Sequence, residues 1–324
     1  MKENNQNIVW GIIGCGDVAE VKSGPAFQKC NNSQLLAVMR RDSQKAQDFA
    51  KRHHVPFWYN KATDLLANKE INAVYIATPP ATHLELAVKS LEAGKNVYLE
   101  KPMTISATEA ETLSEAVKIT GKKLVVAHYR RQLPMFLRVK EWLQDNKIGQ
   151  PQMAELKFFR HQENLQNTNW RLDPAVSGGT FFYDIAPHQL DLLYYFFGSY
   201  QKVSGNSFHH KSNSEFTDIV TGLIDFDNGL QFSGKWNFNA CKTEQIDECN
   251  IYGSKGKITF STFGNEIVLT IGTSKTIEKF THPQHIQQPF IQKTVDYFLG
   301  KTENPCNVDE GKKIIEIMDK FTKK

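Results

Sequence analysis

The chain has 324 residues, of which 40% are hydrophobic and 23% are charged, and its formal net charge is +4. This length predicts two domains with a core in each, and the composition is that of a globular protein. The basic residues are scattered, no apolar run approaches the roughly 20 residues that cross a bilayer, and the polar N-terminus lacks a secretory signal. We therefore expect neither nucleic acid nor a membrane as a partner.

Five cysteines and ten histidines are dispersed along the chain. The cysteines form no Cys-x-x-Cys pair, and an odd, dispersed set is typical of free thiols in a reducing cytoplasm. The histidines show no spacing typical of zinc ligands. We expect a cytoplasmic protein without a metal site.

The first part of the chain alternates strands and helices. Apolar runs predict strands at 8–14, 35–39, 73–78, 96–100 and 123–127. Two helices between them each carry a capping box and a glycine stop: Thr82-x-x-Glu85 with Gly94, and Ser106-x-x-Glu109 with Gly121. Continuous apolar strands separated by helices predict a doubly wound α/β domain with a parallel sheet over residues 1–127.

The remaining chain, residues 128–324, is rich in strands. A helix is expected from Pro134 to Asp145, and strands are expected at 153–159, 219–226, 230–238, 249–253 and 257–261. Asp227-Asn228-Gly229 between two alternating runs predicts a hairpin, and the amphipathic tail 308–321 predicts a closing helix. This indicates an α+β domain with a mainly antiparallel sheet.

A glycine turn, Gly14-x-Gly16-x-x-Ala19, follows the first strand directly. Glycines at these positions let the backbone approach a pyrophosphate, whose charge is met by helix N-terminal amides. A dinucleotide is therefore expected to contact the turn, at Gly14, Cys15, Gly16, Asp17 and Val18. The alternatives are a simple turn in an unrelated α/β fold and, for Cys15, a small packed residue. Gly24-Pro25 should cut the following helix short.

The end of the second strand reads "VMRRD". An acidic residue there would accept hydrogen bonds from the ribose of NAD, whereas a basic residue suits the 2′-phosphate of NADP. Arg40 stands at that point, Arg41 follows, and Asp42 lies beyond. The sequence favours NADP over NAD, with a merely solvated pair of arginines as the alternative.

Glu100-Lys101-Pro102 comes at the carboxyl end of a predicted parallel strand, where open α/β sheets bind their ligands. Pro102 stiffens this exit. A lysine held beside a nicotinamide could donate a hydrogen bond to a substrate oxygen during hydride transfer. A surface lysine after a strand is the alternative.

Asp184 and His188 lie four residues apart in "DIAPHQLD" and would share one face of a helix. Pro187 is easiest to accommodate in a first turn, and if the helix begins near Asp184 the pair still shares one face. Taken alone, the pair is more typical of a capping aspartate and a packed histidine than of half a catalytic site.

These motifs, in this order, resemble the Gfo/Idh/MocA oxidoreductases, and the likeness covers nearly the whole chain. It includes "GIIGCGDVAE", "ATPPATHLELAVKSLEAGKNVYLEKPM", "GGTFFYDIAPHQLDLLYYFFG" and "GSKGKITF". The resemblance implies a Rossmann domain, a second domain on a large open, mainly antiparallel sheet, and a catalytic site formed by Lys101, Asp184 and His188. It also implies cofactor contacts at Thr78, Pro79, Pro80, His83, Glu100 and Lys101.

"NWRLDP" resembles an element of some NADP-linked members, which nominates Trp170 and Arg171 as cofactor contacts. Core packing is the alternative for Trp170. The chain departs from the family's usual pattern at Pro187, where a glycine is common, and at "GGT". Residues 128–131 and 160–164, His161 in particular, are candidates for contacting the substrate. The resemblance also implies a homodimer or homotetramer.

The expected activity is reversible hydride transfer between a nicotinamide and a hydroxyl or carbonyl carbon of a sugar, a sugar derivative or a cyclitol. His188 is the preferred acid/base because its usual pKa suits proton exchange at neutral pH, Asp184 would orient it, and Lys101 is the other possible proton donor. Two alternatives are a glycosidase that uses transient oxidation and a non-catalytic dinucleotide-sensing regulator.

Overall fold

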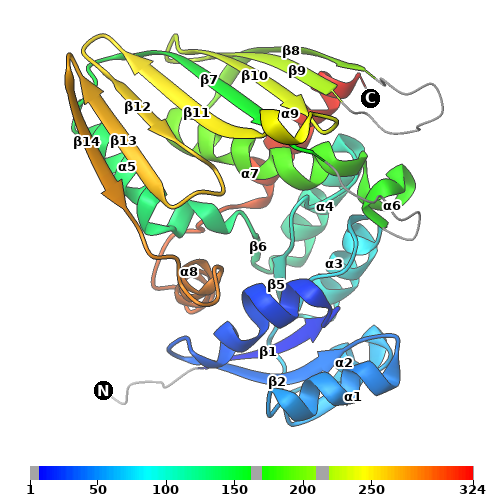
Figure 1. The fold of residues 1–324 in the computed structure, drawn as a ribbon. Coiled ribbons are helices and arrows are strands. Elements are labelled where there is room, and N and C mark those ends of the chain that lie inside the picture. The colour runs from blue at the N-terminus through cyan, green and yellow to red at the C-terminus, as the bar shows by residue number, and fades with distance from the viewer. Residues whose placement is uncertain (1–6, 162–169, 209–218, 324) are drawn as a thin grey trace. The chain divides into compact units, whose positions relative to one another are not determined.

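The computed structural model describes residues 7–161, 170–208 and 219–323, which form two compact units (Figure 1). The first unit comprises Met1–Tyr129 and Pro283–Lys313, and the second comprises Arg130–His282 and Ile314–Lys324. The first division of the chain falls between Tyr129 and Arg130. The return of residues 283–313 to the first unit was not predicted.

The first unit is built on a six-stranded sheet in the order β3-β2-β1-β4-β5-β6, and all of its strand pairs are parallel. Its strands are β1 Ile8–Ile13, β2 Ser33–Met39, β3 Phe57–Tyr59, β4 Ala73–Ile76, β5 Asn96–Leu99 and β6 Leu124–Val126. The chain order reverses between β1 and β4. In such sheets this switch point is where ligands bind, beyond the carboxyl ends of the strands.

Helices connect these strands, as the sequence predicts. They are α1 Ser43–Arg52, α2 Ala62–Ala67, α3 His83–Glu92 and α4 Ala107–Thr120. Ser106 caps α4 by accepting a hydrogen bond from the Glu109 N–H at 3.2 Å, and α4 ends at Gly121 with φ of 62°. The capping box expected at Thr82 is wrong, because its hydroxyl donates to Thr78 and Pro79 instead of capping α3.

The connection after β1 contains no long α-helix. A π-helical segment, η1 Ala19–Ser23, is followed by a 3-10 segment, η2 Gly24–Gln28. A Cβ on Gly24 would lie 2.5 Å from the carbonyl oxygen of Ala19, so the chain packs too closely there for a larger residue. The expectation that Gly24-Pro25 shortens this helix is confirmed.

The returning segment brings α8 Gln288–Phe298 and the first turns of α9 Val308–Thr322 to the first unit. It is attached by polar contacts to buried strands and helices. The Gln287 side chain bonds to Tyr98 and Glu100, and Asp309 accepts a hydrogen bond from Ser114 at 2.9 Å. These are long-range contacts that hydrophobic periodicity does not encode.

The second unit is built on an eight-stranded sheet in the order β14-β13-β12-β11-β7-β10-β9-β8. Its strands are β7 Pro151–Phe159, β8 Tyr200–Phe208, β9 Ile219–Phe226, β10 Gln231–Asn237, β11 Ile246–Gly253, β12 Lys257–Phe260, β13 Glu266–Ile271 and β14 Ser274–Lys279. All pairs are antiparallel except β7 with β10. The expected hairpin joins β9 to β10, with Gly229 at φ 86°.

Helices α5 Pro134–Gln144, α6 Pro174–Ser177 and α7 Thr180–Phe197 complete this unit with the end of α9. Figure 1 shows α7 lying along one face of the sheet, and the rings of Phe182 and Trp236 meet there edge to face at 5.2 Å. The Trp236 Nε1–H also donates to Gln189 at 2.6 Å. The sheet thus fixes α7 through apolar and polar contacts. Among the described residues, no helix combines the length and apolarity that a membrane span requires.

Candidate active site

The chain turns sharply after β1, where the N–H groups of Gly14 and Cys15 both donate to the carbonyl of Met39 at the end of β2. Gly14 has φ of 96°, and a Cβ there would lie 2.9 Å from the carbonyl carbon of Ala77. A Cβ on Gly16, by contrast, would meet no atom within 4 Å. The turn therefore leaves open space beside Gly16, which is the position where a backbone can approach a pyrophosphate closely.

Asp17 and Val18 are the first helical residues after this turn. The first amides of a helix have no intrahelical carbonyl to bind, which suits them to an anion. Cys15 is buried, and burial raises the pKa of its thiol to about 11. Cys15 is therefore a neutral packed thiol, and it contributes to the glycine turn through its backbone.

A guanidinium reaches the glycine turn from the end of β2. Arg40 Nη1 donates to the carbonyl of Cys15 at 3.3 Å, while Arg41 is exposed. Asp42 caps α1 by accepting from the Lys45 N–H at 3.1 Å, and this hydrogen bond lowers the pKa of Asp42. The carboxylate is thus engaged at a helix start, and the positive charge of Arg40 lies nearer the turn.

The loop after β4 carries Thr78, Pro79 and Pro80 and is tied to the loop after β5 by His83. This histidine is fully buried, with Nδ1 2.9 Å from the Pro102 carbonyl and Nε2 2.8 Å from the Thr78 carbonyl. Burial lowers the pKa of His83. A neutral imidazole has one N–H, so it donates to one of these carbonyls at a time. His83 therefore connects the loop after β4, which borders the switch point, to the loop after β5.

Glu100 follows β5 and is only 6% exposed. Its Oε1 accepts hydrogen bonds from the Tyr75 hydroxyl and the Gln287 amide, each at 2.6 Å, and its Oε2 accepts from the Lys101 N–H at 3.1 Å. Three donors around one buried side chain fit a carboxylate. Glu100 thus supports the backbone of Lys101, which is half-buried at the carboxyl edge of the sheet and precedes a cis peptide bond to Pro102.

Asp184 and His188 lie on α7, one turn apart, as predicted. The helix does not begin near Asp184, however. It begins at Thr180, whose N–H donates to Ser177 Oγ at 2.9 Å, and the glycines before it have left-handed φ values. Pro187 therefore lies in the helix interior, where it cannot donate to the carbonyl four residues earlier. The first-turn interpretation of Pro187 is wrong, because the turn at Ser177 starts the helix earlier.

Arg171 contacts one of the predicted catalytic residues. Its Nε lies 3.1 Å from Asp184 Oδ2, and its guanidinium stacks over the Trp170 ring at 4.4 Å. The Asp184 side chain is 26% exposed, whereas His188 is 4% exposed. The cation beside Asp184 favours its charged form. Whether Trp170 and Arg171 also contact a cofactor stays a prediction.

Sequence reasoning missed an aromatic residue beside His188. The ring of Phe263, which follows β12, meets the His188 imidazole edge to face at 5.8 Å. Arg130 lies over the same phenyl ring at 4.3 Å, and Asp247 holds the Phe263 backbone. Burial raises the pKa of Asp247, although hydrogen bonds from Phe263 and Thr262 oppose the shift. No periodic pattern signals these contacts, because Phe263 lies in a turn.

The predicted substrate contacts in 128–131 include two arginines with structural partners. Arg131 is bound through both sides of its guanidinium to Asp191, at 2.7–3.1 Å, and both residues are at most 2% exposed. Arg130 donates to the Thr262 carbonyl at 2.6 Å. His161 Nδ1 lies 2.9 Å from the Ala240 carbonyl, and residues 162–164 lie outside the described residues. Arg131 is thus a buried core residue, and its side chain is not exposed for contact with a sugar.

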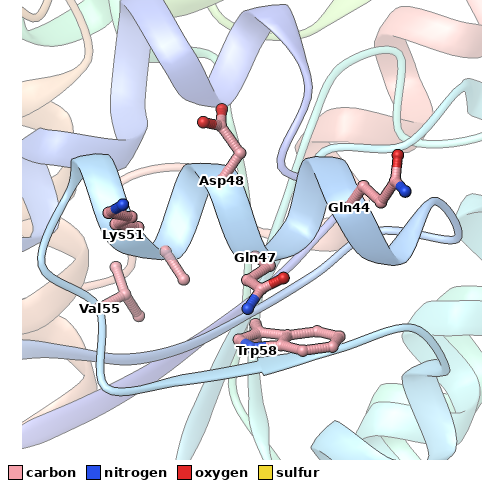
Figure 2. A pocket seen from close by; sticks show the side chains of 7 residues that line it. Gln44, Gln47, Asp48, Lys51, Val55 and Trp58 are labelled. Carbon is pink, nitrogen blue, oxygen red and sulfur yellow. The ribbon is translucent and has the colours of Figure 1, made fainter.

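A pocket of about 540 Å³ opens on the first unit, and none of the predicted site residues lines it (Figure 2). It is lined by Gln44, Gln47, Asp48, Ala50, Lys51, Val55 and Trp58. Figure 2 shows the Gln47 side chain pointing from α1 toward the indole of Trp58, which belongs to the edge strand β3. This pocket is flanked by α1 and β3, not by the loops after β1, β4 and β5. It forms no part of the candidate site.

The parallel sheet, its switch point and the glycine turn are those of a Rossmann fold. The oxidoreductase family with an NAD-binding Rossmann fold matches residues 8–128, and the Gfo/Idh/MocA C-terminal domain matches residues 136–259. Oxidoreductase P35 of Formosa agariphila is 50% identical over 320 residues, covering 97% of this chain and 98% of that protein.

Two further comparisons are more distant. The NADP(+)-dependent scyllo-inositol 2-dehydrogenase of Bacillus subtilis is 28% identical over 67% of this chain and 59% of its own. A solved levoglucosan dehydrogenase, in complex with NADH and levoglucosan, matches the fold with a TM-score of 0.84 at 21% identity, over 98% of this chain and 96% of its own. The chain belongs to the Gfo/Idh/MocA family, and it is an NAD(P)-dependent oxidoreductase.

Proposed function

We propose that this protein transfers a hydride reversibly between a nicotinamide cofactor and the hydroxyl or carbonyl carbon of a sugar, a sugar derivative or a cyclitol. The observation that carries the proposal is the open space beside Gly16 at the switch point, together with Lys101 at the end of β5, which is two strands from β1 in the sheet. The scyllo-inositol dehydrogenase and the levoglucosan dehydrogenase support a polyhydroxylated substrate.

The proposed roles follow from the chemistry of three side chains. The bound nicotinamide would supply the hydride chemistry. Lys101 would donate a hydrogen bond to the reacting oxygen and ease the change of its charge. His188 would exchange the proton, because an imidazole with a pKa of roughly 6.5 titrates near neutrality, and Asp184, one turn away, would stabilise the imidazolium. Lys101 is the other candidate for the proton donor.

These roles can be tested by screening sugars and polyols with purified protein and NADP(+) or NAD(+), and measuring the absorbance of the reduced cofactor that forms. We expect Lys101→Ala and His188→Ala each to lower kcat about 10²- to 10⁴-fold while cofactor binding persists. Ile119→Ala is a matched control, because this residue is 76% exposed on α4 and should leave kcat unchanged. Near-wild-type turnover in either site variant refutes the corresponding role.

The same screen separates the proposal from its rivals. Release of a sugar from a glycoside without net formation of reduced cofactor would indicate a glycosidase that uses transient oxidation. Cofactor binding with no turnover of any carbohydrate would indicate a dinucleotide-sensing regulator. In the direction of substrate oxidation the proton-exchanging group acts as the base, so its protonation produces the acidic limb of the pH profile. That limb should disappear in His188→Ala and persist in a Lys101→Arg variant if histidine exchanges the proton.

We also propose that NADP is the preferred cofactor. Support comes from the guanidinium of Arg40, which lies 3.3 Å from the carbonyl of Cys15 in the glycine turn, and from the engagement of Asp42 as the cap of α1. An arginine binds a phosphate through two parallel hydrogen bonds, and a carboxylate would repel it. Arg40→Ala should raise the Kd for NADP(+) at least about tenfold and leave that for NAD(+) within about twofold. Tighter binding of NAD(+) than NADP(+) by the wild type refutes this preference.

We propose a homodimer or homotetramer that associates through the eight-stranded sheet. Met153, Leu223 and Ile277 are 43–56% exposed on its strands, on the face opposite the buried side chains. Apolar side chains gathered on one sheet face are typical of an interface. Light scattering after size exclusion measures the mass, and Leu223→Asp should lower it. A monomeric wild type at micromolar concentration refutes the proposal.

A further inference from the structure

We propose that the phenyl ring of Phe263 is a stacking platform for the apolar face of a cyclic sugar or cyclitol, set beside His188. This inference rests on the proposed function and narrows its substrate class to rings. It assigns a specificity-determining role to a residue that neither the glycine turn nor the Asp-x-x-x-His pair identifies.

The backbone that carries Phe263 is firmly fixed. Asp247 on β11 accepts hydrogen bonds from the N–H of Phe263 at 2.7 Å and from that of Thr262 at 3.1 Å. From the other side, Arg130 Nη1 donates to the Thr262 carbonyl at 2.6 Å, and this contact is buried. A side chain on such a support is pre-organised, so ligand binding does not have to order it.

The ring itself is held by three groups. The Arg130 guanidinium lies 4.3 Å from its centroid, the His188 ring meets it nearly perpendicularly at 5.8 Å, and the Phe158 ring meets it at 5.9 Å. Despite these contacts Phe263 remains 40% exposed, whereas Phe158 is 5% exposed. Phe263 thus keeps apolar surface in water at a position where its neighbour is a proposed acid/base.

A cyclic sugar matches these features. The C–H groups of one ring face form an apolar surface that can cover exposed phenyl area, which contributes through burial and dispersion. The hydroxyl groups lie at the sugar ring's edge, and His188, which meets the phenyl ring nearly perpendicularly, is the proposed acid/base for one of them. An open-chain alditol has the same hydroxyl groups but no flat face. The platform therefore predicts a preference for cyclic over open-chain substrates.

The test compares D-glucose with D-glucitol and D-xylose with xylitol, in turnover and in binding by saturation-transfer difference NMR with NADP(+) present. The variants are Phe263→Ala, Phe263→Tyr and the control Leu137→Ala, which removes an equally exposed apolar side chain from α5. We expect Phe263→Ala to raise KM for cyclic sugars about tenfold, with kcat changed less than threefold and the cyclic preference lost. Phe263→Tyr should restore both, because it keeps the ring.

Binding data keep this proposal separate from the proposed function. If cyclic sugars bind the wild type and Phe263→Ala weakens that binding, the platform stands even when no sugar is oxidised, and only the proposed function fails. Unchanged KM, unchanged sugar binding and an unchanged cyclic preference in Phe263→Ala overturn the platform. So does an absence of cyclic-sugar binding to the wild type, or a failure of Phe263→Tyr to restore what Phe263→Ala loses.

Discussion

Replacing Tyr75 by phenylalanine removes one hydroxyl from the buried cluster that surrounds Glu100. The hydroxyl donates to Glu100 at 2.6 Å and accepts from Ser23 at 3.1 Å, and Tyr75 is fully buried. Burial raises the pKa of Tyr75 well above its usual value, so the hydroxyl keeps its proton and remains a donor. The phenylalanine retains the ring contacts with Phe27 and Tyr98, at 5.2 and 5.1 Å.

The expected loss follows from the charge of the acceptor. A hydrogen bond to a charged group contributes about 1.5–3 kcal/mol, and one between neutral groups contributes about 0.5–1.5 kcal/mol. Tyr75→Phe should therefore lower the free energy of unfolding by about 2–3 kcal/mol. Tyr98→Phe is the matched control, because this equally buried tyrosine donates to the neutral amide oxygen of Gln287 at 2.9 Å. It should lose only about 1 kcal/mol.

Urea unfolding followed by fluorescence measures both losses. In a Glu100→Gln background the acceptor for Tyr75 is neutral, so Tyr75→Phe should then lose no more than Tyr98→Phe does. The reasoning is refuted if Tyr75→Phe loses no more than Tyr98→Phe in the wild type, or if the excess survives in Glu100→Gln.

Three further predictions concern other positions in the fold. Asp191→Asn should lower the free energy of unfolding by about 3–5 kcal/mol, because it removes the negative charge that binds both sides of the buried Arg131 guanidinium. The double variant Arg131→Met with Asp191→Leu should lose less, and a single-variant loss under about 1 kcal/mol in urea contradicts this. Gly14→Ala should destabilise the fold by about 1–3 kcal/mol, because Gly14 has a left-handed φ. Gly16→Ala should unfold as the wild type does, but calorimetry should show that it binds NADP(+) at least about tenfold more weakly. Equal stability of the two variants contradicts this prediction. Because burial lowers the pKa of His83 in the folded state, the free energy of unfolding should fall as the pH drops below the unfolded-state pKa of about 6.5, by up to about 1.4 kcal/mol per pH unit. His83→Asn should lose this part of the pH dependence. Parallel plots of unfolding free energy against pH for wild type and variant, between about pH 7.5 and 5.5, would disprove the assignment.

Much of the fold could be predicted because local patterns encode it. Continuous apolar runs locate five of the parallel strands, and Ser106 and Gly121 mark the ends of α4 where predicted. Strand β3, Phe57–Tyr59, escaped prediction because it has three residues and none is buried. Strand β14, Ser274–Lys279, lies at the edge of its sheet and has no buried residue, so its sequence shows no apolar alternation.

The elements that sequence reasoning misplaced depend on contacts distant in the chain or on turn chemistry. The return of residues 283–313 depends on pairs such as Gln287 with Glu100, which are 187 residues apart. Helix α7 starts at Thr180 because Ser177 accepts its N–H, and that made Pro187 an interior residue. Propensity favours proline in a first turn, but α7 begins at Thr180, well before Pro187.

The backbone on both sides of Lys101 is held by hydrogen bonds, and this favours a catalytic lysine over a solvated surface lysine. On one side Glu100 accepts its backbone N–H inside a buried cluster, and on the other side His83 contacts the carbonyl of Pro102 at 2.9 Å. Its backbone is therefore held at two neighbouring points, while its side chain is half-buried at the carboxyl end of β5. A group that stabilises a developing charge acts best when its base is fixed beforehand, because little reorganisation then accompanies the reaction. A solvated surface lysine needs no such support. If the support serves catalysis, Tyr75→Phe should lower kcat as well as stability, and the two losses should both diminish in Glu100→Gln.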